Sequence, residues 1–142
     1  MSGKGTKARA GGQQPAKGRT QAVEIRVPYP RNKAQFCKSY GLNAYYAGMH
    51  WSKRKENADR MHDTVAAVLL RDHVSRLPFG KPVRITFWHN DRMDIDNHAI
   101  VEKLIVDALK GWLLVNDDRR FYVERVSKFH AEDYIRVRIE VA

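Results

Sequence analysis

The acidic residues that could do chemistry are concentrated in two short segments of the sequence. Asp94 and Asp96 lie two residues apart between a predicted strand and a predicted helix, and Asp117 and Asp118 directly precede another predicted strand. Carboxylate oxygens are the ligands that Mg²⁺ prefers, so three of these side chains could form an oxygen-only metal site. The alternative is structural: Asp96 or Asn97 caps the helix and the second pair makes a turn.

The predicted helix that follows Asp96 carries a polar stripe beside its apolar face. Counting about 100° per residue places Lys103, Asp107 and Lys110 within roughly 40° of Asp96. The stripe would lie at the edge of the core, where a cleft is expected, although Lys103 and Asp107 could equally form a surface ion pair of the i, i+4 kind. The same count places His98 roughly 160° from Lys103, so we expect it to face elsewhere.

Other sources of chemistry are weak in this sequence. The histidines show no spacing typical of metal ligands, and His89 beside Asp91 is interpreted as a polar residue at a strand end. No Gly-rich phosphate loop and no Ser or Cys nucleophile motif is found. The only cysteine, Cys37, can form neither an internal disulfide nor a thiolate cluster, which favours a cytoplasmic protein.

The elements that must position these residues follow the order β-α-β-α-β-β, which predicts a single α+β domain with a mixed sheet packed by two helices. A polar, aromatic loop is expected between the first strand and the first helix. Ser52 could cap this helix, and Pro78 would end it. Gly111 is placed just past the end of the second helix. A short turn at 130–133 predicts that the last two strands form an antiparallel hairpin. The strands are expected near 22–27, 83–87, 121–129 and 135–141, and the helices near 52–77 and 96–110.

The positive charge is concentrated at the N-terminus. The 142-residue chain has a formal net charge of +10, which indicates a polyanionic partner, with nucleic acid the first candidate. Residues 1–21 contain no acid and lack the apolar residues of a core, so they predict a disordered basic arm that contacts phosphates, or else a passive tail. Without its five basic residues, the body at 22–142 keeps 21 basic against 16 acidic residues, a net charge of +5. The basic residues of the arm are Lys4, Lys7, Arg9, Lys17 and Arg19.

Membrane and secretory proteins are set aside on hydropathy. No run approaches the roughly 18–20 consecutive apolar residues that a bilayer span requires. The basic residues near the N-terminus are not followed by the apolar segment of a signal peptide. No membrane partner is therefore expected.

Taken together, Asp94-Ile95-Asp96-Asn97, Lys103 with Asp107-Ala108-Leu109, Gly111, and the Asp117-Asp118 pair with the strand that follows resemble the RusA family of Holliday-junction resolvases. The specific resemblance covers about residues 91–130, while the earlier elements agree with the family only in order and character. One departure is that Lys103 lies six residues after Asn97, further than in the best-known members.

The resemblance implies a homodimeric, Mg²⁺-dependent endonuclease, with Mn²⁺ as a substitute cation. Such an enzyme recognises a four-way junction or other branched DNA and nicks two strands symmetrically during DNA recombination and repair, in the cytoplasm of a bacterial or phage-infected cell. The family's metal ligands fall on Asp94, Asp96 and Asp118, and its helical lysine falls on Lys103. With the arm, Arg119 and Arg120 would contact DNA phosphates.

Two other functions remain open from the sequence. A non-catalytic, basic DNA-binding or architectural protein would use its acids only as caps and turns. A nuclease for other branched DNA, or one directed at RNA, would use the same acidic site. The acidic cluster favours an enzyme over a pure binder, because a binder gains nothing from carboxylates beside the phosphates.

Overall fold

The computed structural model describes residues 18–142 of the chain. The basic arm expected at residues 1–21 falls mostly outside this range. Four of its five basic residues lie outside the described residues, namely Lys4, Lys7, Arg9 and Lys17.

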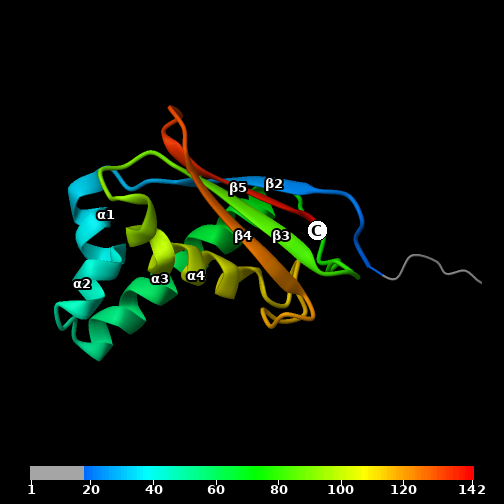
Figure 1. Cartoon of the computed structure of the whole chain (residues 1–142), viewed down its shortest axis with the longest axis horizontal. Helices are drawn as coiled ribbons and strands as arrows, with labels where there is room; N and C mark the ends of the chain where they lie inside the picture. The colour runs from blue at the N-terminus through cyan, green and yellow to red at the C-terminus, as the bar shows by residue number, and fades with distance from the viewer. Residues whose placement is uncertain (1–17) are drawn as a thin grey trace, which may run out of the picture.

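Four strands form one mixed sheet in the order β2-β5-β3-β4. β4 runs parallel to β3, whereas β5 lies between β2 and β3 and is antiparallel to both (Figure 1). The bounds are Val23–Pro28 for β2, Val83–His89 for β3, Tyr122–Phe129 for β4 and Tyr134–Val141 for β5.

The predicted hairpin of the last two strands is wrong, because β3 separates β4 from β5. Burial explains the order. Ile135, Val137 and Ile139 of β5 are 0% exposed and require a central position, while most side chains of β4 are exposed or half-buried, as expected of an edge strand. A short turn at 130–133 is compatible with either arrangement, so the local sequence could not distinguish them.

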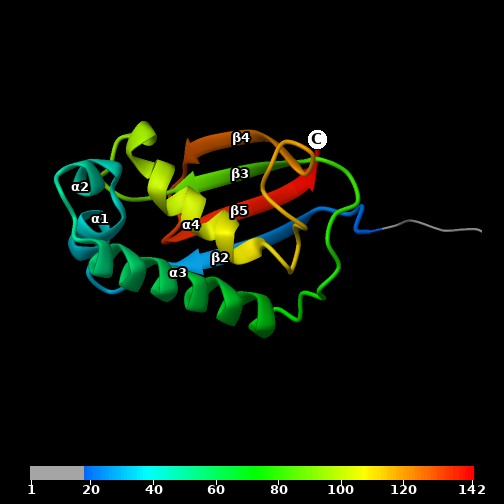
Figure 2. The same ribbon diagram turned by 90° about the horizontal axis from the view of Figure 1, so that it is seen from below.

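Two helices cover one face of the sheet (Figures 1 and 2). They are α3 (Trp51–Arg71) and α4 (Ala99–Leu109), and α4 is preceded by the short 3₁₀ helix η2 (Ile95–His98). This arrangement confirms the α+β class and the mixed sheet. No helix among residues 18–142 is both long enough and apolar enough to cross a membrane.

The segment after β2 is helical where a loop was predicted. It forms α1 (Lys33–Tyr40) and α2 (Leu42–Tyr46). The Asn32 side chain caps α1 by accepting a hydrogen bond from the Gln35 amide at 3.0 Å. Phe36 and Tyr40 lie one helical turn apart and both bury their rings, which stabilises a helix too short to be recognised by periodicity.

The ends of the two long helices differ in how well they were predicted. The residue that caps α3 is His50 rather than Ser52, since the Ser52 amide donates to His50 Nδ1 at 3.1 Å. The helix stops at Arg71, well before Pro78. Gly111 does follow the end of α4, and its φ of +79° is the left-handed conformation that glycine adopts without strain.

The core lies between the sheet and the two long helices. Alternate residues of β2, β3 and β5 point inward and are essentially unexposed, as the alternating apolar pattern predicted. They meet Val65 and Leu69 of α3 and Ile105 and Leu109 of α4 in one apolar cluster. Packing α4 against the parallel pair β3 and β4 fixes where the loops at both ends of this unit lie.

Candidate active site

Asp94 ends the loop that joins β3 to η2, and Asp96 lies in the first turn of η2; both residues are exposed. Asp94 has the extended backbone of an N-cap residue, but its side chain makes no capping hydrogen bond. Within residues 18–142, nearly every other acidic side chain takes part in an ion pair. The exceptions are Asp94, Asp96 and Glu132. Exposed carboxylates without a basic partner are available to bind a cation.

The loop is anchored on both sides of these acids. Asn97 Oδ1 accepts a hydrogen bond from the Asn43 amide of α2 at 2.9 Å, which ties the loop to a distant segment. On the other side, the Met93 amide donates to Asp91 Oδ1 at 2.9 Å, and the Met93 side chain is buried. Hydrogen bonds therefore anchor the backbone on both sides of the exposed carboxylates.

A buried ion pair lies directly beneath the loop. His98 Nε2 lies 2.8 and 3.0 Å from the two carboxylate oxygens of Asp91, and both side chains are fully buried. Tyr29 donates to Asp91 Oδ2 at 3.0 Å. Burial opposes the charged form of each partner, but the hydrogen bonds between them prevail, so the pKa of His98 is raised and the pKa of Asp91 is lowered. A protonated His98 is thus paired with an ionised Asp91.

A second buried pair joins the end of β3 to α4. His89 Nε2 lies 2.7 Å from Glu102 Oε2, which also accepts a hydrogen bond from the Ser127 hydroxyl at 2.6 Å. The Arg125 guanidinium lies 3.2 Å from Glu102 Oε1 but is not aligned for a hydrogen bond, and that oxygen has no hydrogen-bond partner in the described structure. Burial lowers the pKa of His89 against the effect of Glu102, so the imidazole is neutral. His89 Nδ1 is also buried without a partner among residues 18–142.

His89, Asp91 and His98 form a group that could hold a metal ion, since one ligand atom from each lies within 4.8 Å of the others. The two imidazole rings, however, stack at 3.8 Å between centroids with an angle of 24° between their planes. Stacked rings direct their lone pairs side by side rather than toward one point, so a metal ion would require one ring to turn. In the observed geometry both Nε2 atoms hydrogen-bond to carboxylates, and the group forms two His–acid pairs.

The sequence did not reveal this group. His89 does end a strand, as interpreted, and His98 is buried whereas Lys103 is exposed, but the histidine spacing of nine residues suggested no joint site. η2 turns the chain back so that His98 reaches His89. The signal that could have revealed it is the presence of several ionisable residues inside an apolar strand–helix unit.

The predicted polar stripe is present in part: Lys103 and Asp107 lie on α4, whereas Asp96 precedes this helix in η2 and Lys110 follows its end in an extended conformation. Asp107 lies 3.4 Å from both Lys103 Nζ and Lys110 Nζ, and Lys110 Nζ lies 3.7 Å from Asp117. Lys103 and Asp117 also line a small hollow of about 230 Å³ together with Glu102 and Arg125. Lys103 therefore lies beside Glu102 and Asp117 in this hollow. Its ion pair is with Asp107 and not with Asp94 or Asp96.

The segment that leads into β4 and carries Asp118 lies at the opposite end of the β3-α4-β4 unit from the segment after β3, which carries Asp94 and Asp96 (Figures 1 and 2). It precedes the start of β4, beside the start of β3, whereas the two loop acids follow the end of β3. A seven-residue strand spans about 23 Å. One chain therefore does not gather the three predicted metal ligands. We call these two regions the Asp94 end (residues 89–98) and the Asp118 end (residues 110–121).

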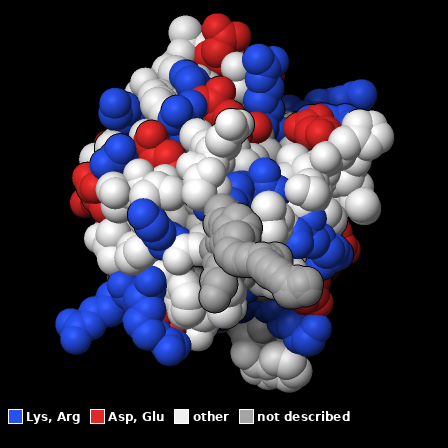
Figure 3. All heavy atoms as spheres, turned by 90° about the vertical axis from the view of Figure 1, so that its right-hand side faces the viewer, with Lys and Arg blue, Asp and Glu red and all other residues white. Residues whose placement is uncertain are grey.

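Asp118 is paired with a basic residue. Arg120 contacts both of its carboxylate oxygens, at 3.0 and 2.8 Å. This hydrogen bonding lowers the pKa of Asp118 to about 2. Figure 3, which views the Asp118 end, shows basic and acidic side chains interspersed rather than a purely acidic cluster. Arg120, predicted to contact DNA, is thus engaged with Asp118, while Arg119 is exposed.

Arg19, predicted as part of the arm, lies against the folded domain. Its guanidinium donates to the Leu77 and Ser75 carbonyls at 2.9 and 2.8 Å and to the Ser75 hydroxyl at 2.7 Å. The folded domain therefore includes Arg19, which precedes the predicted boundary at residue 22.

No protein-family model and no curated protein matches this chain.

Proposed function

We propose that this protein is a structure-specific endonuclease that acts as a homodimer on four-way junctions and related branched DNA. The observation that supports this best is the pair of exposed carboxylates, Asp94 and Asp96, which have no ion-pair partner among residues 18–142 and lie on an anchored segment of a chain with a net charge of +10. In a protein that attracts phosphate by its overall charge, unpaired acids held together favour the binding of a cation. The RusA-like order of motifs adds the reaction class.

The three acids do not fit a Mg²⁺ ion within one chain, because Asp118 lies at the other end of the unit and is paired with Arg120. A homodimer offers a way to complete the ligand set. Asp118 of the partner subunit would have to approach Asp94 and Asp96 and exchange Arg120 for the cation. Dimerisation would then be a condition for activity and not only for affinity.

The chain's own residues would bind and orient the DNA. Lys103 is exposed and its contact with Asp107 at 3.4 Å is long, so its ammonium group can turn to a phosphate at little cost. Arg119 and the basic arm would add contacts to the backbone that are independent of sequence. Selectivity would come from the shape of the branch point.

A non-catalytic DNA-binding protein is the second candidate. It is favoured by the Asp118 end, where both acids are in ion pairs as expected of a structural turn. It leaves the unpaired acids of the Asp94 end without a role, and these would repel DNA phosphates. For this reason the enzyme is the better supported function.

The test is cleavage of a labelled four-way junction and a matched linear duplex in the presence of Mg²⁺ or Mn²⁺. Wild-type protein should produce paired symmetric nicks in the junction only. Asp94→Asn and Asp96→Asn should each reduce the rate roughly 100-fold or more, equivalent to about 3 kcal/mol of transition-state stabilisation, with junction binding unchanged or tighter. Glu132→Gln is the matched control and should cleave normally, since Glu132 is an exposed acid of the neighbouring turn and has no ion-pair partner among residues 18–142.

Mixing two inactive variants tests the shared site. If Asp118 acts across the dimer, mixed dimers of Asp94→Asn and Asp118→Asn contain one intact site, and mixing should restore part of the activity. No restoration after subunit exchange would contradict the shared site. Turnover of Asp94→Asn within a few-fold of wild type would contradict the enzymatic function itself.

A further inference from the structure

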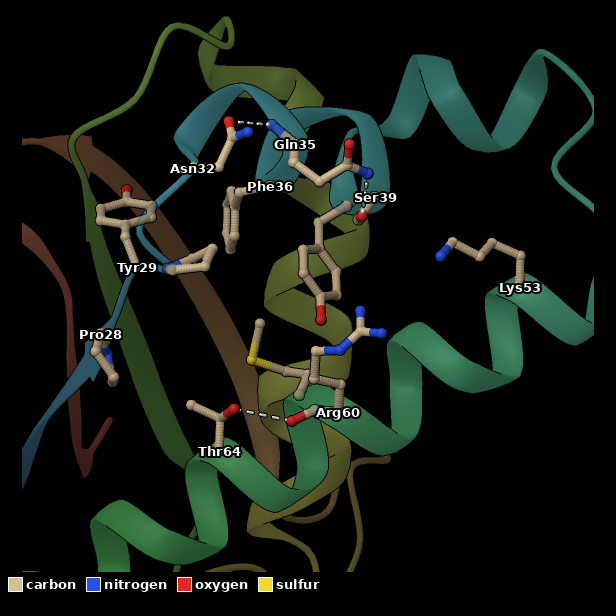
Figure 4. Close-up of a pocket in the computed structure, with 12 residues that line it drawn as sticks. Pro28, Tyr29, Asn32, Gln35, Phe36, Ser39, Lys53, Arg60 and Thr64 are labelled. Carbon is tan, nitrogen blue, oxygen red and sulfur yellow. Dashed lines mark hydrogen bonds between the residues drawn. The ribbon is translucent and has the colours of Figure 1, made fainter.

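A cavity of about 510 Å³ lies between α1, the first half of α3 and the end of β2 (Figure 4). Binding pockets for small ligands occupy roughly 300–1,000 Å³ and have mainly apolar walls with a few polar groups. The walls here are aromatic and apolar. They are formed by Pro28, Tyr29, Pro30, Phe36, Tyr40 and Met61.

Polar side chains line the same cavity. Gln35 and Ser39 project from α1 and Thr64 from α3, and Asn32 stands at the start of α1 (Figure 4). Amide and hydroxyl groups both donate and accept hydrogen bonds, as the edge of a nucleobase requires. The hydrogen bond between Gln35 Nε2 and Ser39 Oγ is long, 3.4 Å, so these groups can exchange it for a ligand at small cost.

The charge around the cavity is positive. Lys53 and Arg60 extend toward it from α3, and none of the lining residues is acidic (Figure 4). Glu56, outside the lining, lies 3.2 Å from Lys53 and 3.4 Å from Arg60, so the three groups together keep one positive charge. An anion such as a phosphate is the complementary group at this rim.

One wall of the cavity is joined to the Asp94 end. The Tyr29 hydroxyl accepts a hydrogen bond from the Asn90 amide at 2.7 Å and donates one to Asp91 at 3.0 Å. Asp94 follows Asp91 by three residues, and such a segment spans at most about 11 Å even when fully extended. A ligand against Tyr29 is therefore close to the loop that carries the unpaired acids.

We propose that this cavity binds one unstacked nucleotide of a DNA strand, with its base against the wall that Tyr29, Phe36 and Tyr40 form together and its phosphate at Lys53 and Arg60. The inference rests on the proposed function and deepens it, since it assigns the recognition of a branch point to a defined site. Nucleotides at a branch point are less stacked and less paired than those of a duplex, so removing one from the helix costs little there. A linear duplex offers no such nucleotide, which would explain selectivity without base-specific contacts.

The experiment measures binding without catalysis. The probe is a fluorescently labelled oligothymidylate of about eight nucleotides, a length suited to a small single-strand site, and the readout is fluorescence anisotropy without divalent cations. Gln35→Trp places an indole across the mouth of the cavity, and Ala34→Trp adds the same group to an exposed neighbour that does not line it. Lys53→Gln removes a cation at the rim, and Lys55→Gln removes one that lies outside the cavity.

We expect Gln35→Trp and Lys53→Gln to weaken binding roughly five-fold or more, the effect of losing one base-stacking contact or one phosphate contact, with the two controls within two-fold of wild type. Equal affinity of Gln35→Trp and Ala34→Trp would overturn the inference. So would a change in oligomeric mass by light scattering for Gln35→Trp with DNA binding unchanged, because the cavity would then hold a protein segment.

Junction cleavage separates this inference from the proposed function. If wild type cleaves junctions and Gln35→Trp binds the oligonucleotide normally, the nuclease function stands and the nucleotide site is refuted. If wild type does not cleave but Gln35→Trp selectively loses oligonucleotide binding, the nucleotide site stands alone. Circular dichroism melting of each variant confirms that a loss of binding is not a loss of folding.

Discussion

The two ends of the β3-α4-β4 unit use acidic residues in opposite ways. At the Asp94 end, His98 is paired with the buried Asp91 and His89 with the buried Glu102 of α4, while the exposed Asp94 and Asp96 have no ion-pair partner in the described structure. At the Asp118 end, each acid of the pair has a lysine or arginine within ion-pair distance. The Asp94 end therefore has paired acids in its interior and acids without ion-pair partners at its surface, whereas the Asp118 end has paired acids at its surface.

This difference distinguishes a prepared site from a turn. A buried ion pair contributes little net free energy of folding, but once formed it fixes the orientation of the groups around it, since breaking it is costly. An exposed pair such as Asp118 with Arg120 is screened by water and can be exchanged easily. Under the proposed function, the Asp94 end would hold a ligand site in place. At the Asp118 end, Asp118 would exchange Arg120 for a cation when a second chain approaches.

The largest difference in stability between the two regions is expected when one buried acid is removed. Glu102→Ala leaves His89 and Ser127 without their shared acceptor, and we expect a loss of about 3 kcal/mol in the free energy of unfolding, since each buried donor left unpaired costs roughly 1–3 kcal/mol. Asp118→Ala should leave the urea midpoint almost unchanged. Chemical denaturation followed by circular dichroism measures both. Glu102→Gln, which keeps an acceptor for His89 and Ser127, should recover part of the loss, and equal effects of Glu102→Ala and Asp118→Ala would contradict the comparison.

The pH dependence of stability gives a smaller effect that belongs to the Asp94 end alone. The raised pKa of His98 means that its contribution is fully present below the unfolded value of 6.5 and is lost as the pH rises through the folded value. His89, whose pKa is lowered, acts in the other direction and only below 6.5. Asp118, with a pKa of about 2, does not titrate in this range. Stability should therefore fall as the pH rises above 6.5.

Urea denaturation between pH 6.5 and 8.5 measures this fall, with His98→Gln as the control. The variant has no titrating group at this position, so its stability should change less over the same range. An equal slope for both proteins would show that His98 is neutral in the folded state, contrary to its pairing with Asp91.

The smallest effect concerns the turn that leads into the Asp118 end. Gly111 has a φ of +79°, and a Cβ atom built there meets nothing within 4 Å, so Gly111→Ala strains only the backbone. We expect a loss of about 1 kcal/mol for alanine and less for Gly111→Asn, since asparagine tolerates this conformation. Denaturant midpoints compare the three proteins. A stabilising effect of alanine would mean that the turn rearranges.

Much of the fold could be read from local pattern, because burial imposes it residue by residue. The alternation of Ile135, Val137 and Ile139 determines an inward face wherever the strand pairs, and the ion pair of Lys103 with Asp107 follows from their i, i+4 spacing on α4. The order of strands does not follow, since a turn at 130–133 permits either a hairpin or the insertion of β5 between β2 and β3. α1 was missed because two aromatic residues and one cap are too few for a periodic signal.

The candidate site divides in the same way. The sequence is enough to place Asp94 and Asp96 on one short segment before a helix, because residues two apart along the chain cannot lie far apart in space. Only the tertiary structure decided that Asp118 lies at the far end of the unit and that His89, Asp91, His98 and Glu102 meet beneath the loop. The physical reason is that such contacts depend on how β3, η2 and α4 pack, and packing energy is summed over the whole core rather than encoded in the spacing of the residues that meet.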